Sequence, residues 1–396
     1  MIASNSHTMR SLLWMLTVFT LAPGCTSSSQ SHGPAWQETF TVGKPQTVIT
    51  AEQMEELDLH MDAGIYAINE GEHWKWFGSN LFWDVVCSIG PRDHPLDSII
   101  VTRGLYQNLP EAHSYNSLTD QGDHTWGNCI WIGNVYGNPE NSHIIAFNHI
   151  EYNAKEGMAD QYGNRSPDYF RFALTISRDG GRTFEWCGYM LSPNMAYETW
   201  LKYWFPRNRP GGNMGLCNYI MKDGYFYMYY TDTEDSPDTL IRGTAVARCS
   251  IGDVLRAAEN HRVAPWKKYY RGKWEEPGLG GRFTALNIPP IHSIHGDAAY
   301  NSYLNKYVLV TLSTDLHEDG QFTGGILISF SEDGMIWSDW QDVRKDDHWH
   351  VYPSIISTGD DNEVTGKSFW IYYQYFERAG ERGGKNRWDR VLVTLD

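Results

Sequence analysis

The chain has 396 residues, of which 41% are hydrophobic and 20% are charged. This balance is typical of a folded protein with a large core and excludes an intrinsically disordered chain. The formal net charge of −16 disfavours nucleic acid as a partner, because an acidic surface repels a polyanion. The 17 Trp and 24 Tyr residues favour a neutral carbohydrate partner, since their flat faces and polar edges match sugar rings. Sheet proteins also favour aromatic residues, which is an alternative explanation.

The N-terminal segment carries a targeting pattern. Arg10 is followed by an apolar run at 12–22, which is too short to span a membrane and is typical of a secretory signal. The next residues, LAPGC at 21–25, resemble a bacterial lipobox, in which Cys25 is lipidated. We therefore expect a signal at 1–25, a polar linker at 26–36, and a lipoprotein exported to the periplasm or the outer surface. Ordinary secretion is the alternative, and membrane contact is expected only through the lipid.

The remaining cysteines predict neither a zinc ribbon nor a complete disulfide framework. They are odd in number and show no CxxC spacing. One or two disulfides and simple buried thiols are both compatible with this count. The five positions are Cys87, Cys129, Cys187, Cys217 and Cys249.

Short runs rich in β-branched and aromatic residues, each bounded by Gly, Asn or Asp, recur along the chain. They predict an all-β protein. The only helices that we expect are short. They lie at 51–57 and at 251–259, where Ser250 is the expected N-cap of the second helix.

A degenerate unit of two consecutive strands occurs five times. Repeats at intervals of tens of residues are typical of propellers, so we expect a single-domain, five-bladed β-propeller at 37–396. Strands expected at 38–42 and at 390–395 lie near the two chain ends, and their pairing in one blade would hide exposed sheet edges. The five units begin at Asp62, Asn128, Asn213, Asp297 and Val351.

Two turn motifs support this architecture. Residues 177–184 (SRDGGRTF) resemble the Asp-box turn of sialidase-like propellers, and residues 331–337 (SEDGMIW) are a shorter relative. In such a turn the aspartate caps backbone N–H groups, glycine takes a positive φ, and the final aromatic ring packs between strands. We therefore interpret Asp179 and Asp333 as structural, and place the third and fourth strands of two blades around them.

In a propeller, polar residues at the start of the inner strands form the natural site. The segments 61–66 (MDAGIY) and 292–307 (HSIHGDAAYNSYLNKY) resemble the five-bladed glycoside hydrolases of the arabinanase, xylosidase, levansucrase and invertase group. That resemblance implies hydrolysis of glycosidic bonds by three acidic residues from different blades. It implies Asp62 as the base or nucleophile and Asp297 as the carboxylate that tunes and orients. No cofactor is required, and a structural calcium or sodium ion in the channel is an open alternative.

For the general acid, the sequence offers two glutamates. Glu151 shares a strand face with His149, because side chains alternate along a strand. Aromatic neighbours would raise the pKa of Glu151 and keep it able to donate a proton to a leaving oxygen. We therefore expect Glu151 to be the acid, with Glu234 as the reserve. The expected substrate contacts, each of which is also a candidate for the channel wall, are Trp74, Trp126, His149, His295 and Tyr352.

The sequence is compatible with other functions. His292 with His295, or His348 with His350, could share a metal, but neither pair has the HExxH spacing. A non-catalytic glycan-binding lipoprotein, a sialidase-like hydrolase and a polysaccharide lyase are the alternatives. The sialidase alternative needs an arginine cluster, and nothing in the sequence groups its arginines. One architecture hosts many reactions, so the fold does not choose among them.

Overall fold

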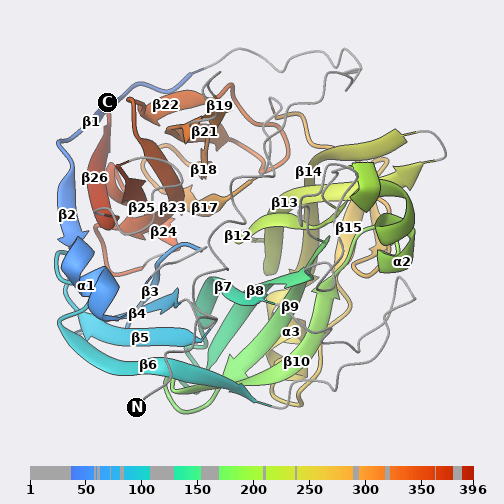
Figure 1. The fold of residues 1–396 in the computed structure, drawn as a ribbon, viewed down its shortest axis with the longest axis horizontal. Coiled ribbons are helices and arrows are strands. Elements are labelled where there is room, and N and C mark those ends of the chain that lie inside the picture. Colours follow the sequence, from blue (N-terminus) through green and yellow to red (C-terminus); the bar gives the residue numbers. More distant parts are fainter. Residues whose placement is uncertain are drawn as a thin grey trace, which may run out of the picture.

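The protein is a five-bladed propeller. In the computed structural model the innermost strands of five blades contact one another in a closed ring around a central axis (Figure 1). This arrangement confirms the all-β class and the five blades expected from the repeated unit. The structure describes residues 37–57, 59, 63–71, 73–80, 84–107, 129–152, 169–207, 211–236, 239–288, 294–316, 322–361, 363–377 and 386–396.

The first two blades form one continuous sheet, because the ends of their outer strands pair in parallel, with Leu105 opposite Thr183. From the axis outward, blade I contains β3 (Tyr66–Asn69), β4 (Trp74–Ser79), β5 (Val85–Gly90) and β6 (Ser98–Gln107). Blade II contains β7 (Cys129–Gly137), β8 (Ile144–Tyr152), β9 (Tyr169–Ser177) and β10 (Thr183–Leu191), and the short β11 (Gly211–Gly212) pairs with β9.

Blades III and IV follow the same order, each with one additional strand. Blade III contains β12 (Met214–Lys222), β13 (Tyr225–Ser236), β14 (Thr239–Ser250), β15 (Lys267–Tyr270) and β16 (Lys273–Pro277). Blade IV contains β17 (Gly296–Asn301), β18 (Lys306–Leu312), β21 (Ile326–Ser331) and β22 (Gln341–Arg344), with β24 (Val364–Thr365) paired to β17. A separate ribbon consists of β19 (Asp315–Leu316) and β20 (Phe322–Thr323).

Blade V closes the ring by joining the two ends of the described chain. Its strands from the C-terminal part are β23 (Trp349–Ser357), β25 (Ser368–Phe376) and β26 (Arg387–Leu395). Both β1 (Phe40–Val42) and β2 (Gln46–Ile49) pair antiparallel with β26, and Figure 1 shows the blue β1 beside the red β26. The predicted closure is confirmed, and it covers an edge that would otherwise be open to another strand.

Alternation along the strands gives each blade two buried faces. On β25, Phe369, Ile371 and Tyr373 belong to one core cluster, whereas Tyr372 packs into another. The first cluster includes residues of blade IV, and the second includes residues of blade I. Because both faces of a blade pack on neighbours, its strands can be apolar on both faces, unlike half-exposed strands.

Both Asp-box turns have the predicted structure. The Asp179 carboxylate accepts hydrogen bonds from the backbone N–H groups of Arg182 (3.0 Å) and Thr183 (2.9 Å). Burial opposes ionisation of Asp179, but these bonds and the Thr183 hydroxyl lower its pKa. In blade IV, Asp333 accepts from the N–H groups of Met335 (2.8 Å) and Ile336 (2.9 Å). The turns join the third and fourth strands of blades II and IV, as predicted.

The two predicted helices are α1 (Ala51–Glu56) and α3 (Ile251–Ala258), capped by the side chains of Thr50 and Ser250. The sequence did not predict a third helical segment. There α2 (Tyr197–Thr199) continues into a π-helix (Trp200–Trp204) and a 3₁₀ turn (Phe205–Arg207). No helix in the described ranges is long and apolar enough to cross a membrane.

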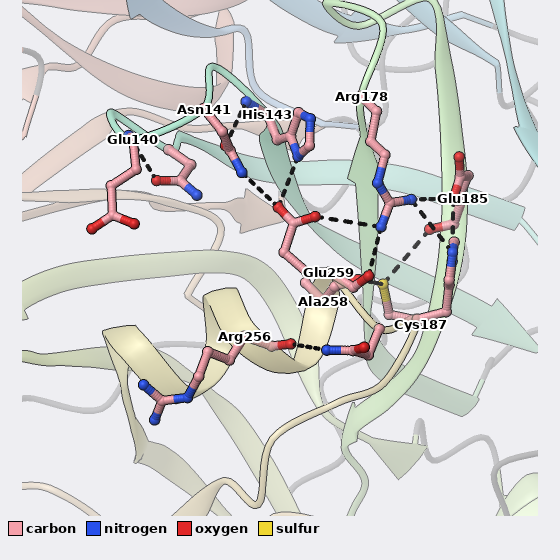
Figure 2. Close-up of polar contacts among 12 residues, drawn as sticks. Glu140, Asn141, His143, Arg178, Glu185, Cys187, Arg256, Ala258 and Glu259 are labelled. Atoms are coloured by element: carbon pink, nitrogen blue, oxygen red, sulfur yellow. Dashed lines mark hydrogen bonds and ion pairs between the residues drawn. The ribbon is translucent and has the colours of Figure 1, made fainter.

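A charged network holds α3 against blade II (Figure 2). The Glu259 carboxylate, at the end of α3, lies 2.7 Å from His143 Nδ1 and accepts from Asn141 Nδ2 at 2.8 Å. Arg178 donates to the backbone carbonyl of Glu259 at 2.9 Å and to Glu185 at 2.5 Å. Burial opposes ionisation of Glu259, but these partners lower its pKa. The network therefore ties blade II to the helix of blade III.

Four cysteines are free, buried thiols: Cys87, Cys187, Cys217 and Cys249. For these four, the structure selects the thiol alternative over disulfides. Burial raises the pKa of Cys87 to about 12, so this thiol is unreactive in the folded protein. Cys25 lies outside the described residues.

Candidate functional site

Polar side chains from blades II to V approach one another where the inner strands begin. Blade II contributes a pair from neighbouring positions of β8. His149 stands directly opposite Trp131 of β7, and Glu151 stands opposite Cys129. Directly opposed residues project from the same face of a sheet, so Trp131, His149 and Glu151 share one face. The face relation predicted for His149 and Glu151 is therefore the one that the strand adopts.

The imidazole of His149 lies beside the carboxylate of Glu151. The distance from His149 Nε2 to Glu151 Oε1 is 3.3 Å. His149 is buried, and its ring contacts Phe170 at 5.1 Å and Phe172 at 5.8 Å between centroids. The Glu151 side chain keeps 16% of its surface exposed. The imidazole thus has a fixed position, from which Nε2–H can orient one carboxylate oxygen.

A second imidazole comes from blade IV. His295 immediately precedes β17, and its pKa is lowered to about 3 by desolvation, with smaller effects from His149 and the positive charge of Arg242 on β14. His295 is therefore neutral at physiological pH. A neutral imidazole both donates and accepts hydrogen bonds, as the hydroxyl groups of a sugar do.

Blade V contributes Tyr352, whose ring meets the His295 ring in a T-shaped contact with centroids 5.9 Å apart. Tyr352 is buried and has φ of 53°, inside the left-handed region, although it is neither Gly nor Asn. The conformation coincides with an irregular register of β23 between Val351 and Ser354. Such strain costs of the order of 1–3 kcal/mol and is found most often at functional sites.

Asp297 lies two residues after His295 and is buried on β17. Its Oδ1 accepts from Asn134 Nδ2 of blade II (2.9 Å) and from the N–H of Ala298 (2.8 Å), and its Oδ2 accepts from Ile355 N–H of blade V (3.0 Å). Burial raises the pKa of Asp297 to about 7 in spite of these bonds. Asp297 thus joins three blades and carries a carboxyl group that changes protonation near neutral pH.

The structure also buries a carboxyl group that sequence reasoning missed, toward the other end of the inner strands, where the backbone carbonyl of Glu363 accepts from the N–H of Tyr300 near the end of β17. Glu363 Oε1 lies 2.6 Å from the hydroxyl of Tyr219 on β12. Burial raises the pKa of Glu363 to about 8, and the nearby charges of Asp297 and Asp361 act in the same direction. Its sequence context, DDNE at 360–363, is typical of a solvated turn and gave no signal of burial.

A fully buried ion pair lies in blade III. Lys268 Nζ is 2.7 Å from Asp232 Oδ2, and both side chains are 0% exposed. Asp232 also accepts from Asn213 Nδ2 at 2.8 Å. Burial raises the pKa of Asp232, while Lys268 opposes that shift. Every hydrogen-bonding group in this pair faces a protein partner, so we interpret it as structural.

Two other residues named from the sequence, Trp74 and Glu234, have arginine partners. Trp74 stands opposite Asn69, the last residue of β3, and therefore lies at the far end of the channel, where Arg92 stacks 4.3 Å above its ring. The carboxylate of the reserve acid, Glu234, lies 3.8 Å from Arg282 Nε. Asp62, Trp126 and His292 lie outside the described residues.

The described part of the chain brings together no group of three side chains suited to a metal ion, so His348 and His350 form no such site there, and the pair of His292 and His295 is not tested because His292 lies outside the described residues. His348 and His350 both contact Asp346 instead, at 3.1 and 2.8 Å. Burial opposes ionisation of Asp346, but its histidine partners lower its pKa to about 2. Asp346 thus acts as the anionic partner of both imidazoles.

No protein-family model matches the chain, and no curated protein matches it. Similar solved structures include a GH43_1 enzyme from Xanthomonas citri, 11% identical, with a TM-score of 0.40 and coverage of 89% of this chain and 90% of that chain. An α-L-arabinanase from Penicillium chrysogenum is 10% identical, with a TM-score of 0.37 and coverage of 88% and 85%. An N-acetylgalactosamine deacetylase from F. plautii is 11% identical, with a TM-score of 0.40 and coverage of 92% and 95%.

The five-bladed architecture that the sequence resemblance implies is confirmed by the sheets of this chain.

Proposed function

We propose that the protein is a glycoside hydrolase that cleaves an extracellular oligo- or polysaccharide. The single observation that carries the proposal is the Glu151–His149 pair, placed where the inner strands begin and close to the neutral imidazole of His295. A carboxyl group positioned by a fixed imidazole is suited to proton transfer to a glycosidic oxygen. Sugar hydroxyls are suitable partners for the neutral His295.

In the proposed mechanism Glu151 is the general acid. His149 Nε2–H donates to Oε1 of Glu151, so that a proton on Oε2 can pass to the leaving oxygen. Asp62 is the proposed base or nucleophile. Asp297 tunes the site, because its own ionisation adds a negative charge to the channel and raises the pKa of neighbouring acids.

We further propose that the protein is exported and anchored through a lipid on Cys25. The support is the apolar run at 12–22 and the lipobox-like residues at 21–25. Metabolic labelling with a fatty-acid analogue tests this. The wild-type protein should incorporate the label and Cys25→Ser should not, whereas an unlabelled, secreted wild-type protein would leave ordinary export as the correct account.

The test of the reaction is product release from plant, algal and bacterial glycans, measured as new reducing ends. Glu151→Gln and Asp62→Asn should each lower turnover roughly 100-fold or more, because an amide cannot transfer the proton or act as the base. Glu275→Gln is the matched control, since it makes the same chemical change at a glutamate of the outermost strand β16, which is 74% exposed and lies 3.7 Å from Lys273, and it should retain activity within a few-fold.

Three outcomes would contradict the assignment. Equal turnover in Glu151→Gln and Glu275→Gln would remove Glu151 from the mechanism. Glycan binding with no turnover on any substrate would favour a glycan-binding lipoprotein. An unsaturated product that absorbs in the ultraviolet would identify a lyase.

A further inference from the structure

Two buried nitrogen atoms on one face of blade II have no hydrogen-bond partner. They are Nε1 of Trp131 and Nδ1 of His149. Trp131 is 5% exposed and His149 is 3% exposed, so solvent does not satisfy these groups. An unsatisfied buried polar group costs about 1–3 kcal/mol, and native proteins keep few of them. A pair on adjacent strands, on the face that carries Glu151, is therefore a candidate for two ligand-binding groups.

The chemistry of the two nitrogens is complementary. An indole Nε1 only donates a hydrogen bond. Because Nε2 of His149 faces the Glu151 carboxylate at 3.3 Å, a neutral imidazole carries its proton on Nε2, which leaves Nδ1 as an acceptor. The site thus offers one donor and one acceptor side by side. A hydroxyl group can accept the hydrogen bond of the indole and donate one to the imidazole.

The strand pairing places the two side chains next to each other. Trp131 and His149 are directly opposed on β7 and β8, and Cβ atoms in such pairs are about 4.5–5.5 Å apart. For one hydroxyl oxygen to bond both nitrogens at about 2.9 Å, the nitrogens must lie within about 5.8 Å of each other. The carboxylate proposed as the acid lies on the same face, two residues from His149 on β8.

We propose that Trp131 and His149 form a hydroxyl-binding subsite that holds one ring hydroxyl of a neutral sugar beside Glu151. This inference rests on the proposed function for its sugar ligand. Trp131 is then a specificity-determining residue, and a sugar that lacks this hydroxyl leaves both nitrogens unpaired. Sites that hydrogen-bond a substrate hydroxyl discriminate strongly against analogues without it.

The test uses Trp131→Phe, which removes the N–H group and retains an aromatic ring. Trp337→Phe is the matched control, because Trp337 also has a buried Nε1 without a partner but packs on Tyr229 behind the Asp-box turn of blade IV. Calorimetry measures binding of arabino-, xylo- and fructo-oligosaccharides in a Glu151→Gln background, where turnover does not interfere. Trp131→Phe should weaken binding roughly tenfold, and Trp337→Phe should leave Kd unchanged.

Thermal unfolding without sugar separates a ligand group from a structural one. Trp131→Phe should lower Tm no more than Trp337→Phe does, since neither loses a protein hydrogen bond. A larger loss in Trp131→Phe would reveal a structural partner and overturn the proposal. Nitrogen-15 NMR should find His149 protonated on Nε2, and a proton on Nδ1 would overturn its acceptor role.

The remaining outcomes distinguish this inference from the hydrolase assignment. If the wild-type protein binds sugar without turnover, and Trp131→Phe weakens that binding, the result supports the subsite and contradicts the hydrolase. Turnover and binding that are unchanged in Trp131→Phe support the hydrolase and overturn the subsite. Failure of all three oligosaccharide classes to bind overturns the subsite for neutral sugars of these types.

Discussion

The buried ion pair of blade III gives the sharpest test of the packing. Lys268 Nζ contacts three acceptors: Asp232 Oδ2 at 2.7 Å, the Ser192 carbonyl at 2.7 Å and the Gly281 carbonyl at 3.0 Å. Lys268→Met retains most of the apolar stem but removes the ammonium group. The Asp232 carboxylate then has no counter-charge in a site that water does not reach.

Removal of one partner from a buried pair costs about 3–5 kcal/mol, because the other charge stays desolvated. That is a large part of the roughly 5–15 kcal/mol by which proteins are stable. With a urea dependence near 3 kcal/mol/M, the midpoint of unfolding should fall by on the order of 1 M. Tryptophan fluorescence and circular dichroism, followed together in urea, measure the change in free energy of unfolding.

Lys273→Met is the matched control. Its side chain is 68% exposed and its ammonium group lies 3.7 Å from Glu275, so the loss should be below about 0.5 kcal/mol. Asp232→Asn added to Lys268→Met should recover a substantial part of the stability, since no charge is then left buried. Equal losses in Lys268→Met and Lys273→Met, or no recovery in the double variant, would refute the reasoning.

Three further predictions concern pH, turns and thiols. Burial raises the pKa of Asp297 to about 7 from 3.8 and that of Glu363 to about 8 from 4.5. Between the ordinary and the raised pKa, the unfolded chain loses these protons more readily than the folded protein does. The free energy of unfolding therefore falls as pH rises toward 7 and 8. Tm should therefore fall between pH 5 and 8, less so in Glu363→Gln, and an identical slope would contradict this. Asp179→Ala should cost about 1–2 kcal/mol in urea unfolding because two backbone donors lose their acceptor, whereas the exposed Asp342→Ala should cost under about 0.5 kcal/mol. Cys217 should be alkylated only after unfolding, as detected by peptide mass spectrometry, and labelling of the native protein would disprove its burial.

The fold was predictable because its signals are local and repeated. Runs rich in β-branched and aromatic residues, grouped into five two-strand units, mark the inner half of every blade, and the Asp-box turns place two of the outer hairpins. The segment at 197–207 was missed because Trp200, Trp204 and Phe205 are buried in a short helical stretch without amphipathic spacing. Its aromatic residues suit a strand as well as a buried helix.

The candidate site was predictable only in part. The relation of His149 to Glu151 follows from alternation within one strand, so sequence alone placed them together. The contact between His295 and Tyr352 joins two blades, and the left-handed φ of Tyr352 has no signal, because tyrosine does not favour that conformation. The burial of Glu363 also depends on long-range packing, which a polar turn sequence does not reveal.

The two kinds of buried polar group in this molecule have different physical consequences. The pair of Asp232 and Lys268 is fully hydrogen-bonded within the protein, so its removal should damage stability and leave sugar binding intact. Trp131 Nε1 and His149 Nδ1 are unpaired in the folded protein, so the fold already carries their desolvation cost. A ligand hydroxyl would relieve that cost on binding, and stability without ligand would gain nothing from these groups. The opposite effects that we expect of Lys268→Met and Trp131→Phe on stability and binding therefore separate the scaffold from the proposed site.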